Sequence, residues 1–329
     1  MSQSARNHKI MCGSIMISCT EFIPSYSELF TYLEEKYGRD EVDRFWSYLF
    51  DPARSACPLV DFVKKEGIRG CFTYWKGTLN EEAADFTMYL NEKAGWFMID
   101  MHHCPSKGRL LDLEKAIGIK PYHHYCLHCD HYRESVAEAG LAYIYNFLGI
   151  DHASCRLMVY DPKVFDGRVI IDENTEIMDR KASDNEYFHR GFHNSMNMGL
   201  EYLGTKHGVE DIREYLTRYA KHVKNKVIDA AKKEGSLKPL EDMILDTYAK
   251  EHAEDAVITN LSADGKTLSV KISWCPALKF FEEDGKKVTR WYDMATTVVM
   301  DTIASEIGAK FEMKSYDPVT GAAEYSFAM

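Results

Sequence analysis

Apolar side chains recur at helical spacing in two long stretches of the chain. Between Tyr26 and Tyr48 they fall three or four positions apart, as in an amphipathic helix. The stripe consists of Leu29, Phe30, Leu33, Val42, Phe45 and Trp46. A comparable stretch runs from about Glu186 to Ala231 and is interrupted near Gly208. The pattern predicts long helical segments here, with more helix at 58–65 and 81–84.

Elsewhere the period of the pattern changes to two, which is typical of strands. The spacing predicts a hairpin from residues 86–90 and 96–101, and a second from 256–260 and 268–272 around an Asp264-Gly265 turn. Both hairpins end at a Cys-Pro pair, Cys104-Pro105 and Cys275-Pro276, where proline removes a ladder donor. After each pair we expect a helix and a terminal hairpin. The helices are expected from Asp130 to Gly149 and from Asp293 to Ile307, and the hairpins from 155–160 with 168–171 and from 311–316 with 323–327.

The same order of elements in both halves accompanies a match of the chain with itself. Tyr32-Leu33 recurs as Tyr202-Leu203, an offset of 202 − 32 = 170 residues, and Cys104 recurs as Cys275. We therefore predict an α+β protein of two tandem pseudo-repeated domains, each with helices packed on an antiparallel sheet. The first repeat covers 1–171, a linker covers 172–185, and a supporting second repeat covers 186–329.

Composition limits the classes of partner. The 40 basic and 51 acidic residues leave a formal net charge of −11, which argues against nucleic acid or an anionic membrane as partner. The apolar run from Ile10 to Cys19 lacks the features of a signal peptide, and no apolar stretch reaches 18 residues. An odd number of cysteines, nine, favours reduced thiols. We expect a cytoplasmic protein that binds a small-molecule substrate and that could form a homodimer.

Imidazole and thiol groups are concentrated between His102 and His131, which hold six of the 13 histidines and three of the nine cysteines. Zinc takes thiolate and neutral imidazole together, and a Cys-x-x-Cys spacing lets two sulfurs reach one ion. Cys126 and Cys129 are therefore candidate ligands of a divalent transition metal, with zinc the favoured ion. His131 is the first choice for an imidazole ligand, and Cys104 is a further candidate.

Three other interpretations of this cluster remain open. Cys126 and Cys129 could be a redox dithiol whose pKa values are lowered by a helix that starts at Asp130. One thiol could be a nucleophile activated by His128 or His131. The cluster could also be aromatic-rich packing with incidental histidines. Cys104 recurs as Cys275 in the half that lacks the cluster, which favours a role in the fold.

Two further groups of residues could carry chemistry. His189 and His193 have the i, i+4 spacing that places two rings on one helix face, although Gly191 weakens such a helix. The segment 288–293 replaces the cluster in the second half. Its residue types favour a packing role, although the segment could also cover a pocket or bind a carboxylate through Arg290. The chain has no glycine-rich phosphate loop and no serine nucleophile motif, so nucleotide use is disfavoured.

The order strand, Cys-Pro, Cys-x-x-Cys-Asp, helix, glycine, strand between Trp96 and Pro162 resembles the L-2-amino-thiazoline-4-carboxylic acid hydrolase-like family. The resemblance rests on Cys104-Pro105 and Cys129-Asp130. It implies hydrolytic opening of a small cyclic amidine.

Together, these observations predict a metal-dependent hydrolase, or a related lyase, that acts on a small cyclic amide or amidine. His124, His128 and Asp130 are its candidate acid–base groups, because such groups must titrate or accept a proton near the metal-bound water. The alternative is a non-catalytic ligand-binding or sensory module with a structural zinc site. Three protein ligands plus water would favour catalysis, and four closed ligands would favour structure.

Overall fold

The computed structural model describes residues 16–51 and 57–329, which form two compact units. Unit 2 is continuous, Leu29–His189, whereas unit 1 combines residues 16–28 with Arg190–Met329. The boundaries therefore lie at 28/29 and 189/190 and not at the ends of the expected linker 172–185, which itself contains a strand of unit 2. Each unit is described separately below.

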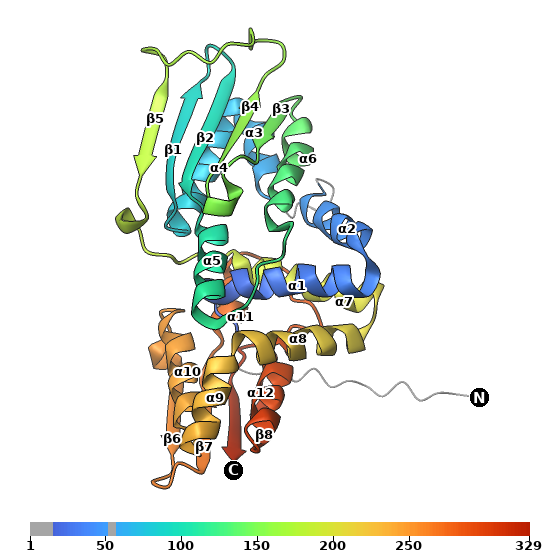
Figure 1. Ribbon diagram of the computed structural model, residues 1–329, viewed down its shortest axis with the longest axis vertical. Helices are drawn as coiled ribbons and strands as arrows, with labels where there is room; N and C mark the ends of the chain where they lie inside the picture. Colours follow the sequence, from blue (N-terminus) through green and yellow to red (C-terminus); the bar gives the residue numbers. More distant parts are fainter. Residues whose placement is uncertain (1–15, 52–56) are drawn as a thin grey trace, which may run out of the picture. The chain divides into compact units, whose positions relative to one another are not determined.

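Both units combine helices with an antiparallel sheet, which confirms the α+β class (Figure 1). The division falls inside helix α1 (Phe22–Tyr37). Unit 2 contains α2 (Arg39–Phe50), α3 (Leu59–Glu66), α4 (Ile68–Glu81), α5 (Pro105–Ile117), α6 (Tyr132–Ala137), β1 (Asp85–Asn91), β2 (Trp96–His103), β3 (Ala142–Asn146), β4 (Cys155–Tyr160) and β5 (Glu176–Arg180). Unit 1 contains α7 (Phe192–Lys206), α8 (Val209–Val223), α9 (Asn225–Glu234), α10 (Lys238–Ala249), α11 (Pro276–Glu283), α12 (Met294–Glu306), β6 (Val257–Leu261), β7 (Thr267–Ile272), β8 (Lys310–Tyr316) and β9 (Ala323–Ala328).

The five strands of unit 2 follow the order β3-β4-β2-β1-β5. Helix α4 packs on β1, β2 and β4, α6 packs on β3, and α3 contacts both helices. The inner residues of β1, Phe86, Met88 and Leu90, are at most 1% exposed. They form the core of the unit between sheet and helices.

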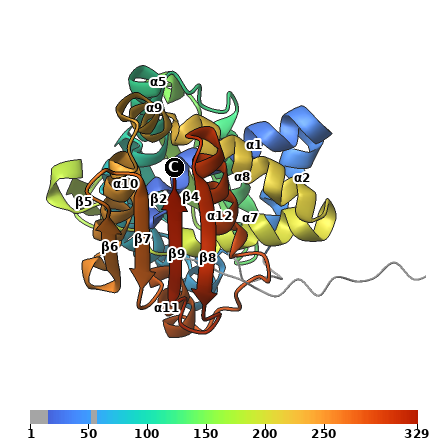
Figure 2. The ribbon, with the colours of Figure 1, turned by 90° about the horizontal axis from the view of Figure 1, so that it is seen from below.

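Unit 1 shows the alternation of a half-buried sheet most clearly in β7. Leu268, Val270 and Ile272 are buried, while the residues between them are exposed. The buried residues lie opposite Phe327, Tyr325 and Ala323 of β9, which are buried as well. Helix α10 packs on β6 and α12 on β8, and Figure 2 shows this sheet face on with the helices behind it.

The two sheets share one strand order. Strands β1-β2-β4-β3 of unit 2 and β6-β7-β9-β8 of unit 1 follow each other identically, and β5 is an additional edge strand. In both units a cysteine directly precedes the helix that follows the first hairpin, and its N–H donates to a carbonyl ahead of the fourth strand: Cys104 to Ala153 (2.6 Å) before β4, and Cys275 to Thr320 (2.9 Å) before β9. The duplication itself stays a prediction from the sequence.

Two expected elements of unit 2 are wrong. Residues 130–149 do not form one helix, because the chain turns at Gly140 (φ +73°) and continues as β3, which pairs with β4. Val136, Leu141, Ile144, Tyr145 and Leu148 would form the buried stripe of such a helix, but Leu148 is 83% exposed. Residues 168–171 are not a strand either; the strand comes later, as β5, and pairs with β1.

The helical predictions need smaller corrections. The stretch from Tyr26 to Tyr48 is divided into α1 and α2 at Gly38, whose φ of +86° ends the first helix. Residues 81–84 are the end of a helix and not its body, because α4 occupies Ile68–Glu81. None of the helices in the described ranges is both long enough and apolar enough to cross a membrane.

Candidate metal centre and adjoining pocket

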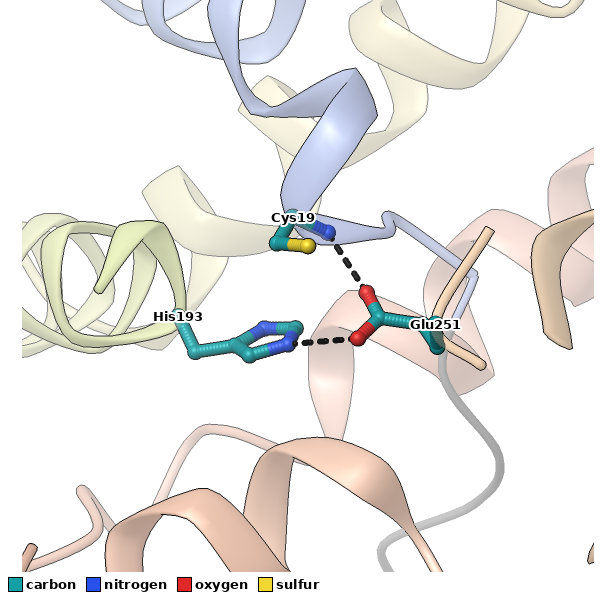
Figure 3. Close-up of side chains that lie close together, drawn as sticks. All are labelled: Cys19, His193 and Glu251. Atoms are coloured by element: carbon teal, nitrogen blue, oxygen red, sulfur yellow. Dashed lines mark hydrogen bonds and ion pairs between the residues drawn. The ribbon is translucent and has the colours of Figure 1, made fainter. Parts of the chain in front are cut away.

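Three side chains from separate parts of unit 1 converge at one buried point (Figure 3). Cys19 begins a short 3₁₀ turn (Cys19–Glu21) ahead of α1, His193 lies in the first turn of α7, and Glu251 follows the end of α10. Their ligand atoms all lie within 4.8 Å of one another. Among residues 16–51 and 57–329, no other group of three such side chains meets this condition.

Glu251 holds the group together. Its Oε1 accepts the backbone N–H of Cys19 at 2.6 Å, and its Oε2 lies 3.1 Å from His193 Nε2. Cys19, His193 and Glu251 are only 1%, 2% and 5% exposed. A carboxyl group at this depth is costly unless it is hydrogen-bonded, and here each of its two oxygens has a partner.

The local backbone aims each side chain at the centre. After α10 the chain reverses through His252, whose φ of +52° is in the left-handed region, and the N–H groups of Glu251 and Ala253 both donate to the carbonyl of Tyr248. This turn presents the Glu251 carboxylate inward. A non-glycine residue in this conformation costs free energy that the surrounding structure must offset.

His193 is oriented from its other side. Its Nδ1 lies 3.4 Å from the hydroxyl of Tyr292, so Nε2 is the nitrogen that faces Glu251 and Cys19. Metal-bound histidines usually donate their second N–H to such an outer partner, which fixes the ring and its tautomer.

The Cys275 thiol lies nearby and stays protonated. Burial raises its pKa to about 12, and the Glu251 carboxylate contributes to the rise, although N–H groups at the start of α11 act in the opposite direction. Cys275 therefore serves the fold at the end of the hairpin, as its recurrence in sequence suggests. It is not one of the three converging side chains.

Unit 1 also contains a cavity of about 720 Å³, and Tyr292, whose hydroxyl lies 3.4 Å from His193 Nδ1, belongs to its wall. The lining residues are Asn197, Glu201, Thr205, Leu278, Lys287, Val288, Thr289, Arg290, Trp291, Tyr292, Asp293, Tyr316 and Pro318. Its deeper residues, such as Leu278 and Asp293, are buried, while Lys287 and Arg290 are exposed at the rim. The cavity is large enough for a small organic molecule.

The residues of the predicted Cys/His cluster lie in unit 2 and are held by separate local contacts. Cys104 Sγ accepts the N–H of Lys107 at 3.5 Å and caps α5. His131 Nδ1 lies 2.8 Å from Glu134 Oε1, and its ring packs near Trp46. Within the described residues, Cys126, Cys129, His131 and Cys104 are not gathered into a group of the kind formed by Cys19.

The candidate acid–base groups of that cluster are also engaged. Asp130 pairs with Arg133, and His128 Nδ1 contacts the carbonyl of Tyr125. Burial lowers the pKa of His128 to about 4, so its imidazole is neutral near pH 7. His124 is exposed, and its ring lies tilted against that of His123, with 4.1 Å between the ring centroids.

The thiols of Cys126 and Cys129 in unit 2 do not have the lowered pKa values of an activated dithiol. Cys126 and Cys129 lie in a 3₁₀ helix (Tyr125–His131), and no helix starts at Asp130 to lower their pKa values. Burial raises the pKa of Cys126 to about 11 and that of Cys129 well above its usual range, with Cys104 and Cys155 adding to the latter rise. His128 Nε2 lies 3.6 Å from Cys129 Sγ, but these pKa values favour the neutral pair over thiolate and imidazolium.

The expected helical pair His189 and His193 is divided. Helix α7 begins only at Phe192, because Gly191 stands at its N-cap, and His189 pairs with Glu81 within unit 2. Of the two histidines, His193 alone reaches the centre. Cys19 and Glu251 are not among the sequence-predicted ligands, since neither lies in a local motif; only the i, i+4 histidines pointed toward this region.

Comparison of the chain with protein-family models, with curated proteins and with solved structures found no match.

Proposed function

We propose that unit 1 holds one divalent transition-metal ion at Cys19, His193 and Glu251, and that the chain is a metal-dependent hydrolase for a small polar molecule bound in the adjoining cavity. The observation that carries the proposal is the convergence of a thiol, an imidazole and a carboxylate within 4.8 Å, next to a cavity that shares Tyr292 with the centre. Zinc is the metal that this mixed sulfur, nitrogen and oxygen set suits best.

The spacing fits a metal after a small adjustment. Ligand atoms around a tetrahedral zinc ion lie roughly 3.5 Å apart, given metal–ligand bonds of about 2.0 to 2.3 Å. The separations of up to 4.8 Å therefore need side-chain shifts of about 1 Å. Cys19 would bind as thiolate and His193 through Nε2, which requires the proton between His193 and Glu251 to leave.

Three protein ligands leave a coordination position for water, the arrangement common in catalytic sites. A metal ion there would lower the pKa of that water toward 7. For a cyclic amide or amidine, water adds to the ring carbon, the carbon–nitrogen bond breaks, and the proton passes to the nitrogen. Glu201 and Asp293 are the carboxylates that line the cavity and are the candidates to move this proton.

Metal content tests the first step of the proposal. Purified full-length protein should hold about one equivalent of metal by plasma mass spectrometry, and Cys19→Ala, His193→Ala and Glu251→Gln should each remove most of it. The double variant Cys126→Ala/Cys129→Ala is the control, because it tests the cluster predicted from sequence. Retention of metal by His193→Ala but not by the double variant would contradict the proposed centre.

Activity tests the second step. Metal-loaded protein should hydrolyse at least one member of a panel of small cyclic amides and amidines, and His193→Ala should lower kcat by about 10²-fold or more. Tyr292→Phe keeps the ring but loses the hydroxyl beside His193, so about a 10-fold loss of metal affinity is expected.

A second candidate function is a ligand-binding or sensory module with a structural metal. It is favoured by the burial of all three ligands, none of which is more than 5% exposed. This candidate predicts that metal removal unfolds unit 1. A fully loaded protein with no turnover on the panel, whose chelation collapses the unit, would favour the module over the hydrolase.

A further inference from the structure

Arg290 differs from almost every other arginine that the structure describes. Twelve arginines occur in residues 16–51 and 57–329, and of these only Arg109 and Arg290 neither donate a hydrogen bond nor form an ion pair there. Arg109 is stacked on Tyr187 in unit 2. Arg290 lines the cavity of unit 1, so its donors are available to a ligand there.

The guanidinium of Arg290 packs on the ring of Trp291. Its Cζ lies 4.2 Å from the centroid of the Trp291 ring, an arrangement that leaves the planar edge with its N–H donors open. Trp291 is buried against Gly204 of α7, where an added Cβ would lie 2.5 Å from the ring. Glycine at this helical position therefore allows the indole to pack closely on α7.

The loop that carries Arg290 is fastened to the same helix. Asn197 Oδ1 accepts the N–H of Thr289 at 2.7 Å, and its Nδ2 donates to the carbonyl of Lys287 at 3.1 Å. Glu201 accepts the hydroxyls of Thr289 and Thr205 at 2.5 and 3.3 Å. The Asn197 side chain thus bonds the backbone on both sides of Val288. These bonds fix the loop that carries Arg290 before a ligand arrives, so the wall of the cavity is preorganised.

Lys287 supplies a second cation without an anionic partner in the described part of the chain. Glu201 lines the same cavity, yet it is occupied by the two hydroxyls and forms no ion pair with Lys287 or Arg290. Lys287 and Arg290 thus lie at the mouth of a cavity whose lining also holds Glu201 and Asp293. Their N–H donors are open to a ligand.

We propose that this cavity takes a small molecule with a single carboxylate, which Arg290 binds through two parallel N–H···O bonds with Lys287 beside it. A planar guanidinium fork matches a planar carboxylate. A doubly charged phosphate fits less well, because Glu201 and Asp293 line the same cavity and would repel it. As the substrate class of the enzyme, this inference rests on the proposed function; as a binding site, it is independent of the metal.

The test measures binding of three monocarboxylates, acetate, benzoate and 2-pyrrolidone-5-carboxylate, by calorimetry and by the change in tryptophan fluorescence, to which Trp291 contributes. At least one should bind more tightly than its uncharged carboxamide. Arg290→Gln should weaken that binding about 10- to 100-fold, the usual range for losing a bidentate charged contact. Arg213→Gln, which removes an exposed arginine paired with Glu210, should leave it unchanged.

Failure of this inference can be separated from failure of the proposed function. His193→Ala should abolish metal binding while the carboxylate still binds, because Arg290 does not contact the centre. If none of the three carboxylates binds below 10 mM, or if Arg290→Gln binds as the wild type does, the inference is overturned. Tighter binding of inorganic phosphate than of any carboxylate would overturn it as well.

Discussion

At the scale of single residues, burial decides the chemistry of the cysteines and histidines more than their spacing does. Cys126 and Cys129 have the spacing of a metal or redox pair, yet burial raises both pKa values. Cys19 and Glu251 have no informative neighbours in sequence and are 232 positions apart, yet they are joined by a hydrogen bond. Residue types in sequence therefore indicate which chemistry is available, and only the fold shows which groups meet.

His128 gives a prediction about acid stability. Burial lowers its pKa to about 4 from the usual 6.5, so below pH 6.5 the unfolded state binds a proton that the folded state does not. The stability of unit 2 should therefore be complete above pH 6.5 and fall as the pH drops toward 4. Between pH 7 and 5 the loss should be about 2 kcal/mol, and hydrogen exchange of peptides from unit 2 measures it.

Substitution identifies the group responsible for this acid slope. His128→Gln should remove most of the slope, because no imidazole is then left to charge in the unfolded state. His123→Gln should retain the acid slope, because 61% of the His123 side chain is exposed. A slope that survives in His128→Gln would assign the effect to another group.

At the scale of elements, the sequence predicts strands better than the helices around them. The hairpins predicted at 86–90 with 96–101 and at 256–260 with 268–272 agree with β1, β2, β6 and β7 to within two residues, because alternation and an Asp-Gly turn are local signals. Residues 130–149 mislead because Val136, Leu141, Ile144 and Leu148 also satisfy helical spacing. Pairing with β4, which is a tertiary contact, decides the strand.

The turn between β8 and β9 supplies a prediction at this scale. Gly321 has φ of +73°, and an added Cβ would lie 2.2 Å from the Cβ of Cys275. Gly308 has nearly the same φ, +72°, with nothing within 4 Å. Gly308→Ala should therefore cost only the strain of the left-handed conformation, about 1 kcal/mol, whereas Gly321→Ala should cost about 3 kcal/mol or more.

Denaturant unfolding measures the loss in free energy of unfolding for each glycine variant. The strain of the left-handed backbone is common to both variants. The difference between them measures how closely the Cys275 position is packed against the turn. Equal losses in the two variants would mean that the turn can move away from Cys275 without cost. In that case the shared Cys-Pro position of the two sheets would not constrain the fold of unit 1.

At the scale of the whole molecule, the chain path is the feature that sequence patterns do not reveal. The self-match predicts two consecutive repeats, and the two sheets have the same strand order. Residues 16–28, however, belong with Arg190–Met329, so unit 2 is inserted within unit 1. This path brings Cys19 to His193 and Glu251, and no periodicity near Cys19 could indicate it.

The insertion predicts which segments lose protection together. Ile244 is fully buried in α10 of unit 1, and Ile244→Ala should destabilise that unit by about 2–5 kcal/mol through the cavity it leaves. Hydrogen exchange followed by mass spectrometry should then show faster exchange in residues 16–28 together with 190–329, and little change in β1 to β5. The contacts that tie the first segment to the rest of unit 1 include the Tyr215 hydroxyl, which donates to the carbonyl of Ser25 at 2.8 Å, and the ion pair of Lys224 with Glu21 at 3.0 Å.

Leu90→Ala is the matched variant in unit 2, because Leu90 is 1% exposed in β1. It should accelerate exchange across 29–51 and 57–189 and leave residues 16–28 protected. The two variants thus show with which unit residues 16–28 unfold, and this test does not depend on metal binding. If residues 16–28 lost protection with Leu90→Ala and not with Ile244→Ala, that segment would unfold with unit 2. Cys19 would then leave the centre whenever unit 2 opens, and a three-ligand metal site confined to unit 1 could not be maintained.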